Sequence, residues 1–177
     1  MKFKELSIPG LFEIDLFHAE DHRGSFTKTF NKEWFQKHGL DFDFDESFFS
    51  INTKGVIRGM HFQLPPHDHS KLVYATHGRI LDVVLDIRKD SPTFGMFASI
   101  EISHENHKAI YMPKGVAHGF CCLSDATMVY MTSTMHHMES DSGIKWDSFG
   151  LSWPVKEPII SDRDQGFDSF SDTKSPF

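Results

Sequence analysis

The chain has 177 residues, a formal net charge of −7 and a hydrophobic content of 39%, including 18 phenylalanines. This composition fits one compact domain with a packed core and excludes a disordered chain. The negative charge argues against a protein that binds nucleic acid through its overall field. The N-terminal segment has no apolar stretch of signal-peptide length, and no run approaches a membrane span, so we expect a cytoplasmic protein without membrane contact.

Short β runs separated by turn signals make up most of the sequence. The first run covers 11–17, and the only helix is expected at 31–39, where Gly39 closes it. The remaining runs cover 71–77, 79–88, 96–103, 107–113, 119–124 and 127–134. Strands at this spacing predict an antiparallel barrel or sandwich. We therefore expect a mostly β, jelly-roll domain over residues 1–177, with a polar surface tail from about residue 165.

The two cysteines are adjacent, at Cys121 and Cys122. Adjacent cysteines rarely bridge each other and do not form a disulfide framework. We expect two buried free thiols in a strand, as is usual in a reducing compartment.

Histidines accompanied by glycines mark two strand segments, RGMHFQ at 58–63 and PKGVAHGF at 113–120. Glycine in a strand allows a ligand or another backbone to approach closely. A single histidine is weak evidence, because the chain contains 12. A barrel would, however, bring Arg58, His61, Lys71 and His118 together, and this combination predicts a functional site.

The order of the longer motifs resembles that of the dTDP-4-dehydrorhamnose 3,5-epimerase family. From about residue 6 to residue 164 these motifs are PGLFEID, DHRGSF, RGMHFQLPP, KLV, GRILDVVLDIRKDSPTFG, YMPKGVAHGF, GIKWDSFGLSWP and PIISDRD. The resemblance implies a homodimeric cupin-type jelly roll. It also implies an isomerase without metal or organic cofactor that inverts C3, C5 or both in a nucleotide-diphosphate 4-keto-6-deoxy sugar, for deoxysugar and surface-polysaccharide biosynthesis.

The resemblance assigns four catalytic residues. His61 matches the base, Asp164 the carboxylate that orients it, and Tyr130 the acid on the opposite face of the sugar, while Lys71 lies near the substrate. This set suits the chemistry, because removing a hydrogen beside a ketone needs a positioned base and stabilisation of the enolate. Asp162 is an alternative to Asp164, and Tyr130 would also fit as a packed strand residue with a satisfied hydroxyl.

The resemblance also assigns residues that bind the substrate. Arg23 and Arg58 match groups that hold the diphosphate, which the planar guanidinium binds bidentately. Phe26 matches a residue of the nucleotide site, His118 lies near the sugar, and Arg163 completes the set.

Departures from the family pattern fall where the nucleotide is expected. The family usually has Glu where this chain has Lys28, and Gln-x-Asn where it has Glu46 and Phe48. Because a glutamate side chain only accepts hydrogen bonds, Glu46 favours a base edge with amino donors, as in cytosine or guanine. Phe48 would stack on any base. Alternatively, Lys28 and Glu46 pair with each other, so dTDP, CDP and GDP all stay open.

A further departure concerns the sugar, since Asp141 replaces the family's glutamate before GIKW. This change bears on whether C3, C5 or both are inverted.

Two other classes of protein compete with an epimerase. His67-Asp68-His69 followed by His118 is similar to the site of metal-dependent cupins, but the usual glutamate is missing and Lys71 would oppose a cation. We expect His67 and His69 in a solvated loop and the His136-His137 pair on the surface. A cupin that binds a sugar nucleotide without catalysis is the other alternative, although it would not need base, orienting carboxylate and acid together.

Overall fold

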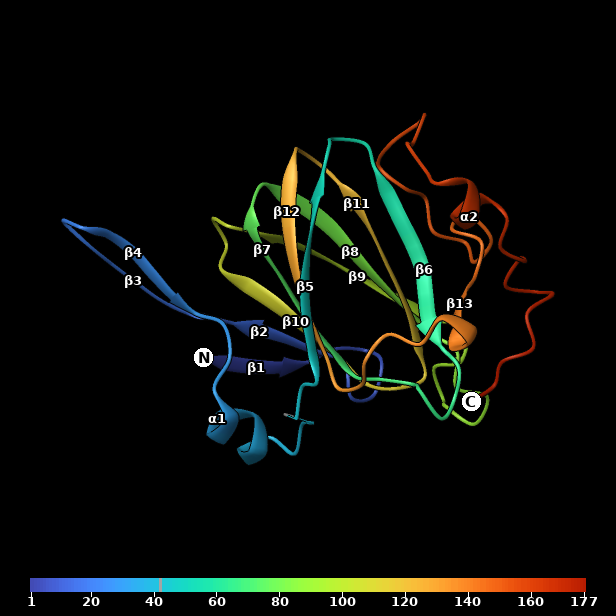
Figure 1. The fold of residues 1–177 in the computed structure, drawn as a ribbon, viewed down its shortest axis with the longest axis horizontal. Coiled ribbons are helices and arrows are strands. Elements are labelled where there is room, and N and C mark those ends of the chain that lie inside the picture. The colour runs from blue at the N-terminus through green and yellow to red at the C-terminus, as the bar shows by residue number, and fades with distance from the viewer. Residues whose placement is uncertain (42) are drawn as a thin grey trace.

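Two antiparallel sheets form the body of the protein in a computed structural model that describes residues 1–41 and 43–177 (Figure 1). The first sheet has the order β1-β2-β10-β7-β12-β5. Its strands are Lys2–Glu5, Phe12–Asp15, Lys108–Met112, Lys71–His77, Ala126–Thr132 and Glu46–Asn52. The second has the order β13-β6-β11-β8-β9. Its strands are Asp141–Gly143, Ile57–Gln63, Val116–Cys122, Arg79–Asp86 and Phe97–Ser103.

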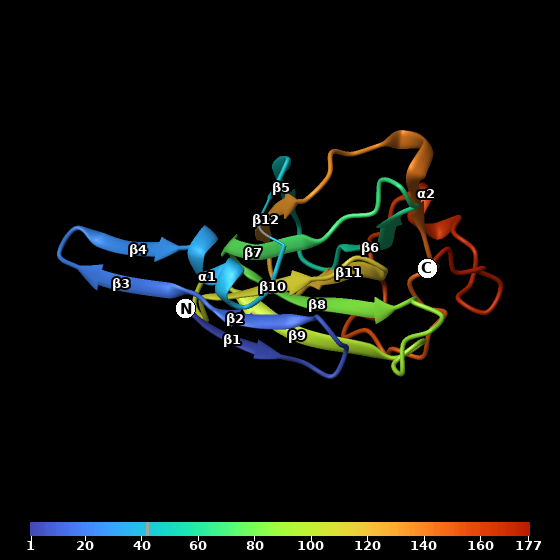
Figure 2. The same cartoon turned by 90° about the horizontal axis from the view of Figure 1, so that it is seen from below.

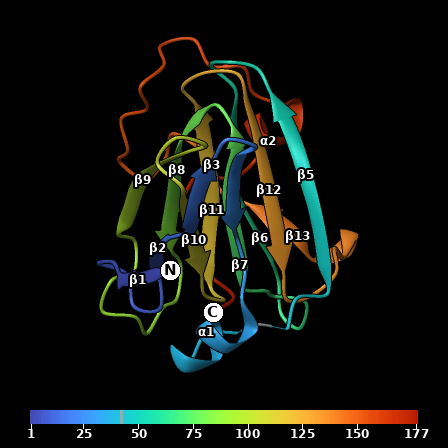
Figure 3. The same ribbon diagram turned by 90° about the vertical axis from the view of Figure 1, so that its left-hand side faces the viewer.

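A separate hairpin of β3 (Phe17–Asp21) and β4 (Gly24–Lys28) extends away from the sheets, on the side opposite to α2 (Asp162–Gln165) and the C-terminus (Figures 1 and 2). Strand β5 lies at an open edge of the first sheet beside β12 (Figure 3).

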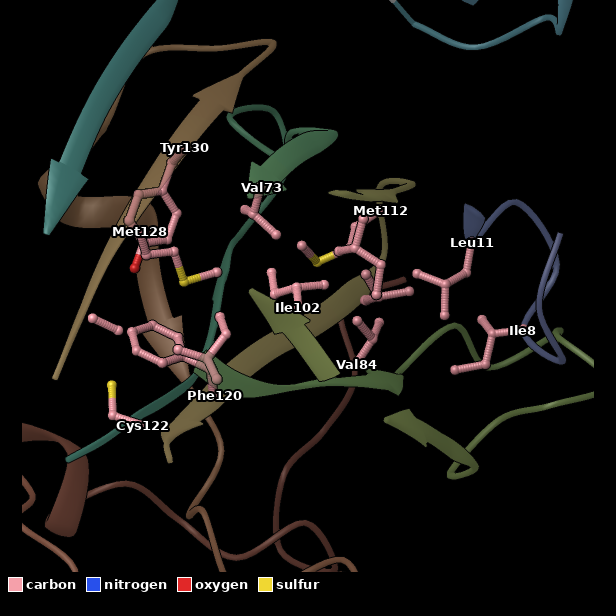
Figure 4. Close-up of a cluster of buried hydrophobic side chains, with 14 residues drawn as sticks. Ile8, Leu11, Val73, Val84, Ile102, Met112, Phe120, Cys122, Met128 and Tyr130 are labelled. Atoms are coloured by element: carbon pink, nitrogen blue, oxygen red, sulfur yellow. The ribbon is translucent and has the colours of Figure 1, made fainter. Parts of the chain in front are cut away.

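The main core lies between the inner faces of the two sheets. Residues that alternate along each strand point inward, as expected from the two-residue period of a strand. Figure 4 shows the cluster running from Ile8 and Leu11 at one end to Phe120, Met128 and Tyr130 at the other. The core therefore ends at the residues that line the candidate active site.

The outer faces of both sheets are covered by different parts of the chain. Helix α1 (Lys32–Lys37) places Phe35 on the first sheet, where it packs with Ile14, Leu72 and Tyr111. Asn31 caps this helix, because its side chain accepts a hydrogen bond from the Trp34 backbone N–H at 3.1 Å. The outer face of the second sheet is covered by residues from the C-terminal third of the chain.

The C-terminal segment from residue 165 is polar in composition and mostly exposed, and two aromatic side chains attach it to the body. Phe170 and Phe177 pack against the core cluster of the second sheet, and Ser175 is buried. Aromatic side chains spaced through the polar segment fix it to the body, because they bury apolar surface.

The structure confirms the mostly β prediction and most of the expected strands. The run at 11–17 is divided between β2 and β3, and the helix is shorter than 31–39. Both cysteines are free and buried in β11. Within residues 1–41 and 43–177, no helix is both long and apolar enough to cross a membrane.

Candidate active site

A β-bulge brings Arg58 and His61 to the same face of β6, although they lie three residues apart. His61 pairs with His118 of β11 and Arg58 pairs with Phe120, so two residues of β6 lie opposite Gly119 alone. The strands approach so closely that a Cβ atom on Gly59, which has φ +119°, would lie 2.6 Å from the Gly119 Cα. The glycines noted in the sequence therefore allow the bulge that directs both side chains inward.

These inward-facing side chains line a cavity of about 310 Å³ between the two sheets. The second sheet contributes Arg58, His61 and His118, while Lys71 and Tyr130 come from the first sheet. The remaining lining residues are Phe48, Ser50 and Phe120. The fold thus gathers the residues that the sequence places on separate strands.

Asp164 holds His61 from behind. Its Oδ1 lies 2.8 Å from His61 Nε2, and its Oδ2 accepts the Gly59 backbone N–H at 2.9 Å. Burial raises the pKa of Asp164, but the hydrogen bond and charge of His61 outweigh this and hold the pKa below its ordinary value. An ionised carboxylate only accepts, so Nε2 carries the hydrogen and Nδ1 keeps its lone pair. Burial lowers the pKa of His61, against the opposing effect of Asp164, and favours the neutral imidazole of a base.

A second histidine–carboxylate pair lies next to the first. His118 Nε2 is 2.8 Å from Asp82 Oδ2, and both side chains are buried. The other oxygen, Asp82 Oδ1, has no hydrogen-bond partner among the described residues. Burial raises the pKa of Asp82, opposed by the nearby charge and hydrogen bond of His118. The sequence analysis missed Asp82, because no motif distinguishes it from the other aspartates of the predicted strands.

Lys71 brings an ammonium group to the same cavity from the start of β7. Burial lowers its pKa from 10.5 to about 8, opposed by the negative charges of Asp141 and Asp82. A cation that is poorly hydrated and faces a cavity stabilises negative charge developing on a bound molecule.

Tyr130 lies on the opposite sheet from His61, and both its hydroxyl and its ring have a partner. Its hydroxyl is 3.0 Å from Ser50 Oγ, and its ring stacks on Phe48 with centroids 4.7 Å apart. Burial raises the pKa of Tyr130, so the phenol keeps its proton through the neutral range. The hydroxyl is therefore satisfied, as the structural alternative required, but it also borders the cavity and can act as an acid.

A second cavity, of about 180 Å³, adjoins the first and has a charged lining. Glu46, Asp141 and Arg163 line it, and His61, Lys71 and Phe48 border both cavities. Arg163 Nη2 lies 2.8 Å from Asp141 Oδ2, and Glu46 Oε2 accepts the His136 backbone N–H at 2.7 Å. Of the two aspartates weighed for the base, Asp164 contacts His61 and the exposed Asp162 does not orient it.

The hairpin residues predicted to bind the nucleotide lie elsewhere. Arg23 pairs with Asp21, Phe26 is 57% exposed, and the Lys28 ammonium lies 5.4 Å from the centre of the Trp34 ring. None of the three lines either cavity described above. Lys28 and Glu46 form no ion pair with each other within the described parts of one copy, and the pairing of the two stays a prediction.

Gln63 determines which ring nitrogen of His69 carries the hydrogen. His69 is one of the histidines expected in a solvated loop. The Gln63 amide is oriented by backbone groups, since its Oε1 accepts from His137 N and its Nε2 donates to His67 O. The same Nε2 also lies 3.1 Å from His69 Nδ1 and 3.3 Å from Met135 O. Because an amide nitrogen only donates, His69 Nδ1 is placed to accept, and the hydrogen lies on His69 Nε2, which has no partner among the described residues.

His69 is half-buried rather than solvated, and in this tautomer neither ring nitrogen offers a free lone pair to a metal. Burial lowers its pKa to about 2. His136 is exposed as expected, but it also borders the charged cavity. The motif His67-Asp68-His69 did not predict the contacts of His69, because these contacts depend on Gln63 and on the loop at 133–140.

A jelly-roll barrel with a histidine held by a carboxylate and a tyrosine across one cavity is typical of a cupin-type sugar-nucleotide isomerase. The family model of dTDP-4-dehydrorhamnose 3,5-epimerase matches residues 5–172, and the chain belongs to this family. It is 41% identical over 166 residues to the dTDP-4-dehydrorhamnose 3,5-epimerase of Shigella flexneri, covering 92% of this chain and 91% of that protein.

Solved structures agree with this assignment. The chain is similar to a dTDP-6-deoxy-D-glucose-3,5-epimerase from Legionella pneumophila in complex with dTDP-4-keto-L-rhamnose. That match has a TM-score of 0.93 and 31% identity, and it covers 98% of this chain and 94% of the other. A 3'-monoepimerase from Streptomyces bikiniensis in complex with dTDP-quinovose gives a TM-score of 0.88 at 31% identity, covering 94% and 86%.

Proposed function

We propose that this protein epimerises C3, C5 or both in a nucleotide-diphosphate 4-keto-6-deoxy sugar. The most fitting substrate is dTDP-4-dehydro-6-deoxyglucose, which would become dTDP-4-dehydrorhamnose for deoxysugar and polysaccharide biosynthesis. One observation carries the proposal. His61 and Tyr130 border the same cavity from opposing sheets, so a sugar between them meets a base on one face and an acid on the other.

The proposed reaction uses this arrangement in two proton transfers. His61 Nδ1 takes the hydrogen from the carbon beside the ketone, and the electron pair of the broken C–H bond moves to the keto oxygen as an enolate. Lys71, with His118 beside it, stabilises the negative oxygen. The enolate then collapses as Tyr130 donates its hydroxyl proton to the opposite face of the same carbon. The imidazolium and the phenolate return to their starting forms by exchange with solvent.

The rest of the substrate fits the remaining lining residues. Arg58 borders the first cavity, in which we place the sugar, and Arg163 borders the second, charged cavity. Both arginines are therefore placed to bind a diphosphate. Glu46 and Asp141 border the charged cavity as well and act in binding. The identity of the base is proposed as thymine on the names of the relatives, with cytosine or guanine as the alternative that Glu46 supports. The monoepimerase relative supports inversion at one centre as a second version of the reaction.

The second copy of a homodimer is the partner we propose for the hairpin. Phe17 and Phe26 are 45% and 57% exposed on β3 and β4, and Phe49 and Ile51 are 65% and 73% exposed on the edge strand β5. Exposed apolar side chains of this kind are typical of an interface. In a dimer, Arg23, Phe26 and Lys28 would complete the nucleotide site of the other copy, and light scattering on the purified protein tests this. The two free buried cysteines support a cytoplasmic location.

Proton NMR in deuterated water tests the function directly. The protein is incubated with dTDP-, CDP- and GDP-linked 4-keto-6-deoxyglucose, and the signals of the sugar are followed. Loss of the C3 or C5 signal in one of the three identifies the reaction, the centre and the base together. Binding of a sugar nucleotide by folded protein without any exchange would overturn the proposal in favour of a non-catalytic binding protein.

A further inference from the structure

Phe48 covers one face of the Tyr130 ring. The two residues are direct partners in the pairing of β5 with β12, and their rings lie nearly parallel, at 13°. Tyr130 is 8% exposed, whereas Phe48 is 45% exposed and borders both cavities. The phenylalanine is therefore the outer member of the stack, and the tyrosine is enclosed between it and the core.

Ser50, two residues further along β5, contacts the Tyr130 hydroxyl. The Oγ–Oη distance is 3.0 Å, and Asn52 Nδ2 donates to the same Ser50 Oγ at 3.0 Å. Asn52 is in turn fixed by Arg58, whose Nε donates to its Oδ1 at 2.7 Å. Alternate residues of a strand share one face, so a single strand supplies both the ring contact and the hydroxyl contact.

We propose that Phe48 and Ser50 are positioning residues for Tyr130, which set the place from which the phenol returns a proton to the substrate. Phe48 fixes the plane of the ring, and Ser50 fixes the direction of the hydroxyl. This proposal rests on the epimerase function above. Among the described residues, neither side chain has a hydrogen bond or ring contact with His61, so neither is expected to act in the removal of the proton.

The proposal separates two observable steps. Removal of the proton by His61 exchanges hydrogen at the substrate carbon with solvent, and donation by Tyr130 produces the inverted sugar. A misplaced phenol slows inversion but leaves exchange into recovered substrate, because returning the proton from the original face needs only His61. The ratio of inversion to exchange therefore reports the placement of Tyr130.

The experiment measures this ratio by NMR in deuterated water for a matched set of variants. Tyr130→Phe gives the full effect of losing the acid. We expect Phe48→Ala and Ser50→Ala to lower the ratio in the same direction by about tenfold, the scale expected for a misplaced catalytic group. Phe48→Tyr and Ser50→Thr restore the flat ring and the hydroxyl, and should restore most of the ratio.

Phe94→Ala is the control for Phe48→Ala. Phe94 is 44% exposed, close to the 45% of Phe48, and lines neither cavity, so its loss removes a ring of similar exposure without touching Tyr130. The same ratio in Phe48→Ala and Phe94→Ala would overturn the proposal. So would equal losses of inversion and exchange in Phe48→Ala with a raised KM, because that result makes Phe48 a substrate contact. Absence of both steps in the unchanged protein would instead reject the epimerase function.

Discussion

The site contains two histidine–carboxylate pairs that look alike but differ in their surroundings. His61 and His118 are direct partners on neighbouring strands, and each has Nε2 2.8 Å from an aspartate oxygen. The His61 side chain is 28% exposed, whereas that of His118 is 5% exposed. Asp164 has hydrogen bonds to both oxygens, whereas Asp82 lacks a partner for Oδ1 among the described residues.

The surroundings of each histidine–carboxylate pair, rather than the pairing itself, therefore determine which proton transfers the pair can support. The satisfied Asp164 has a lowered pKa and stays ionised, so it orients His61 in a way that suits the base role proposed for this histidine. Asp82 has a raised pKa because it is buried, so its charge is less readily available to support an imidazolium. We therefore assign proton removal to the first pair and substrate contact to the second.

The largest expected effect comes from His61→Asn. It removes the base while keeping a polar side chain of similar reach, so we expect turnover to fall by at least about 10³-fold, within the range of general base catalysis. His118→Asn should cost at least tenfold less than His61→Asn. Steady-state rates with the preferred sugar nucleotide, and thermal unfolding to confirm the fold, provide the measurement. A larger loss in His118→Asn would reverse the assignment of the two pairs.

Asp164→Asn should have the next largest effect. The amide can accept from only one of its two present donors, so His61 loses either its orientation or its preferred tautomer, and we expect turnover to fall on the order of 100-fold. The matched change Asp82→Asn should lower turnover less. Equal losses in the two variants would mean that both carboxylates support the base.

The plot of activity against pH should be bell-shaped, with an acidic limb from His61 and an alkaline limb from Lys71. His61 must be neutral to act, and its lowered pKa means that activity persists below pH 6.5 and is lost as pH falls through the pKa in the folded protein. Lys71 must be charged, so activity should fall by about fivefold over the unit above its pKa of about 8.

A matched variant and a stability measurement test the alkaline limb. Lys71→Arg should move this limb upward, because arginine stays protonated. Between pH 8 and 10.5 the folded state binds fewer protons at Lys71 than the unfolded state does, so the contribution of Lys71 to stability rises with pH there while activity falls. If stability and activity both fell between pH 8 and 10.5, the alkaline limb would be caused by unfolding rather than by Lys71.

The smallest expected effect concerns the base of the nucleotide and leaves both pairs untouched. Glu46→Gln adds a donor to a side chain that only accepts, so we expect relative affinity to move towards thymidine nucleotides by roughly threefold to tenfold, the value of one neutral hydrogen bond. Calorimetric titration with dTDP, CDP and GDP measures the shift. Unchanged ratios would mean that Glu46 does not read the base, and the His136 contact would then be its main role.

Much of the site could be predicted from sequence because its motifs are local. RGMHFQ, YMPKGVAHGF and SDRD carry His61, His118 and Asp164 at fixed spacings, and the structure joins His61 to Asp164 as expected. Asp82 was missed because an aspartate in an alternating strand looks like any solvated charge. Phe48 was expected against a base, and its contact with Tyr130 depends on a strand pairing that no local pattern reveals.

Strand periodicity predicted a mostly β protein, and motif order indicated the dTDP-4-dehydrorhamnose 3,5-epimerase family, because both patterns are formed by residues that are close in the sequence. Which side chains meet depends instead on the way the strands pair. The bulge opposite Gly119 changes the alternation of β6 and so turns Arg58 and His61 to one face, against a simple two-residue period. Burial then sets the different pKa directions of Asp164 and Asp82, because the cost of burying a charge depends on partners that lie far away in the chain.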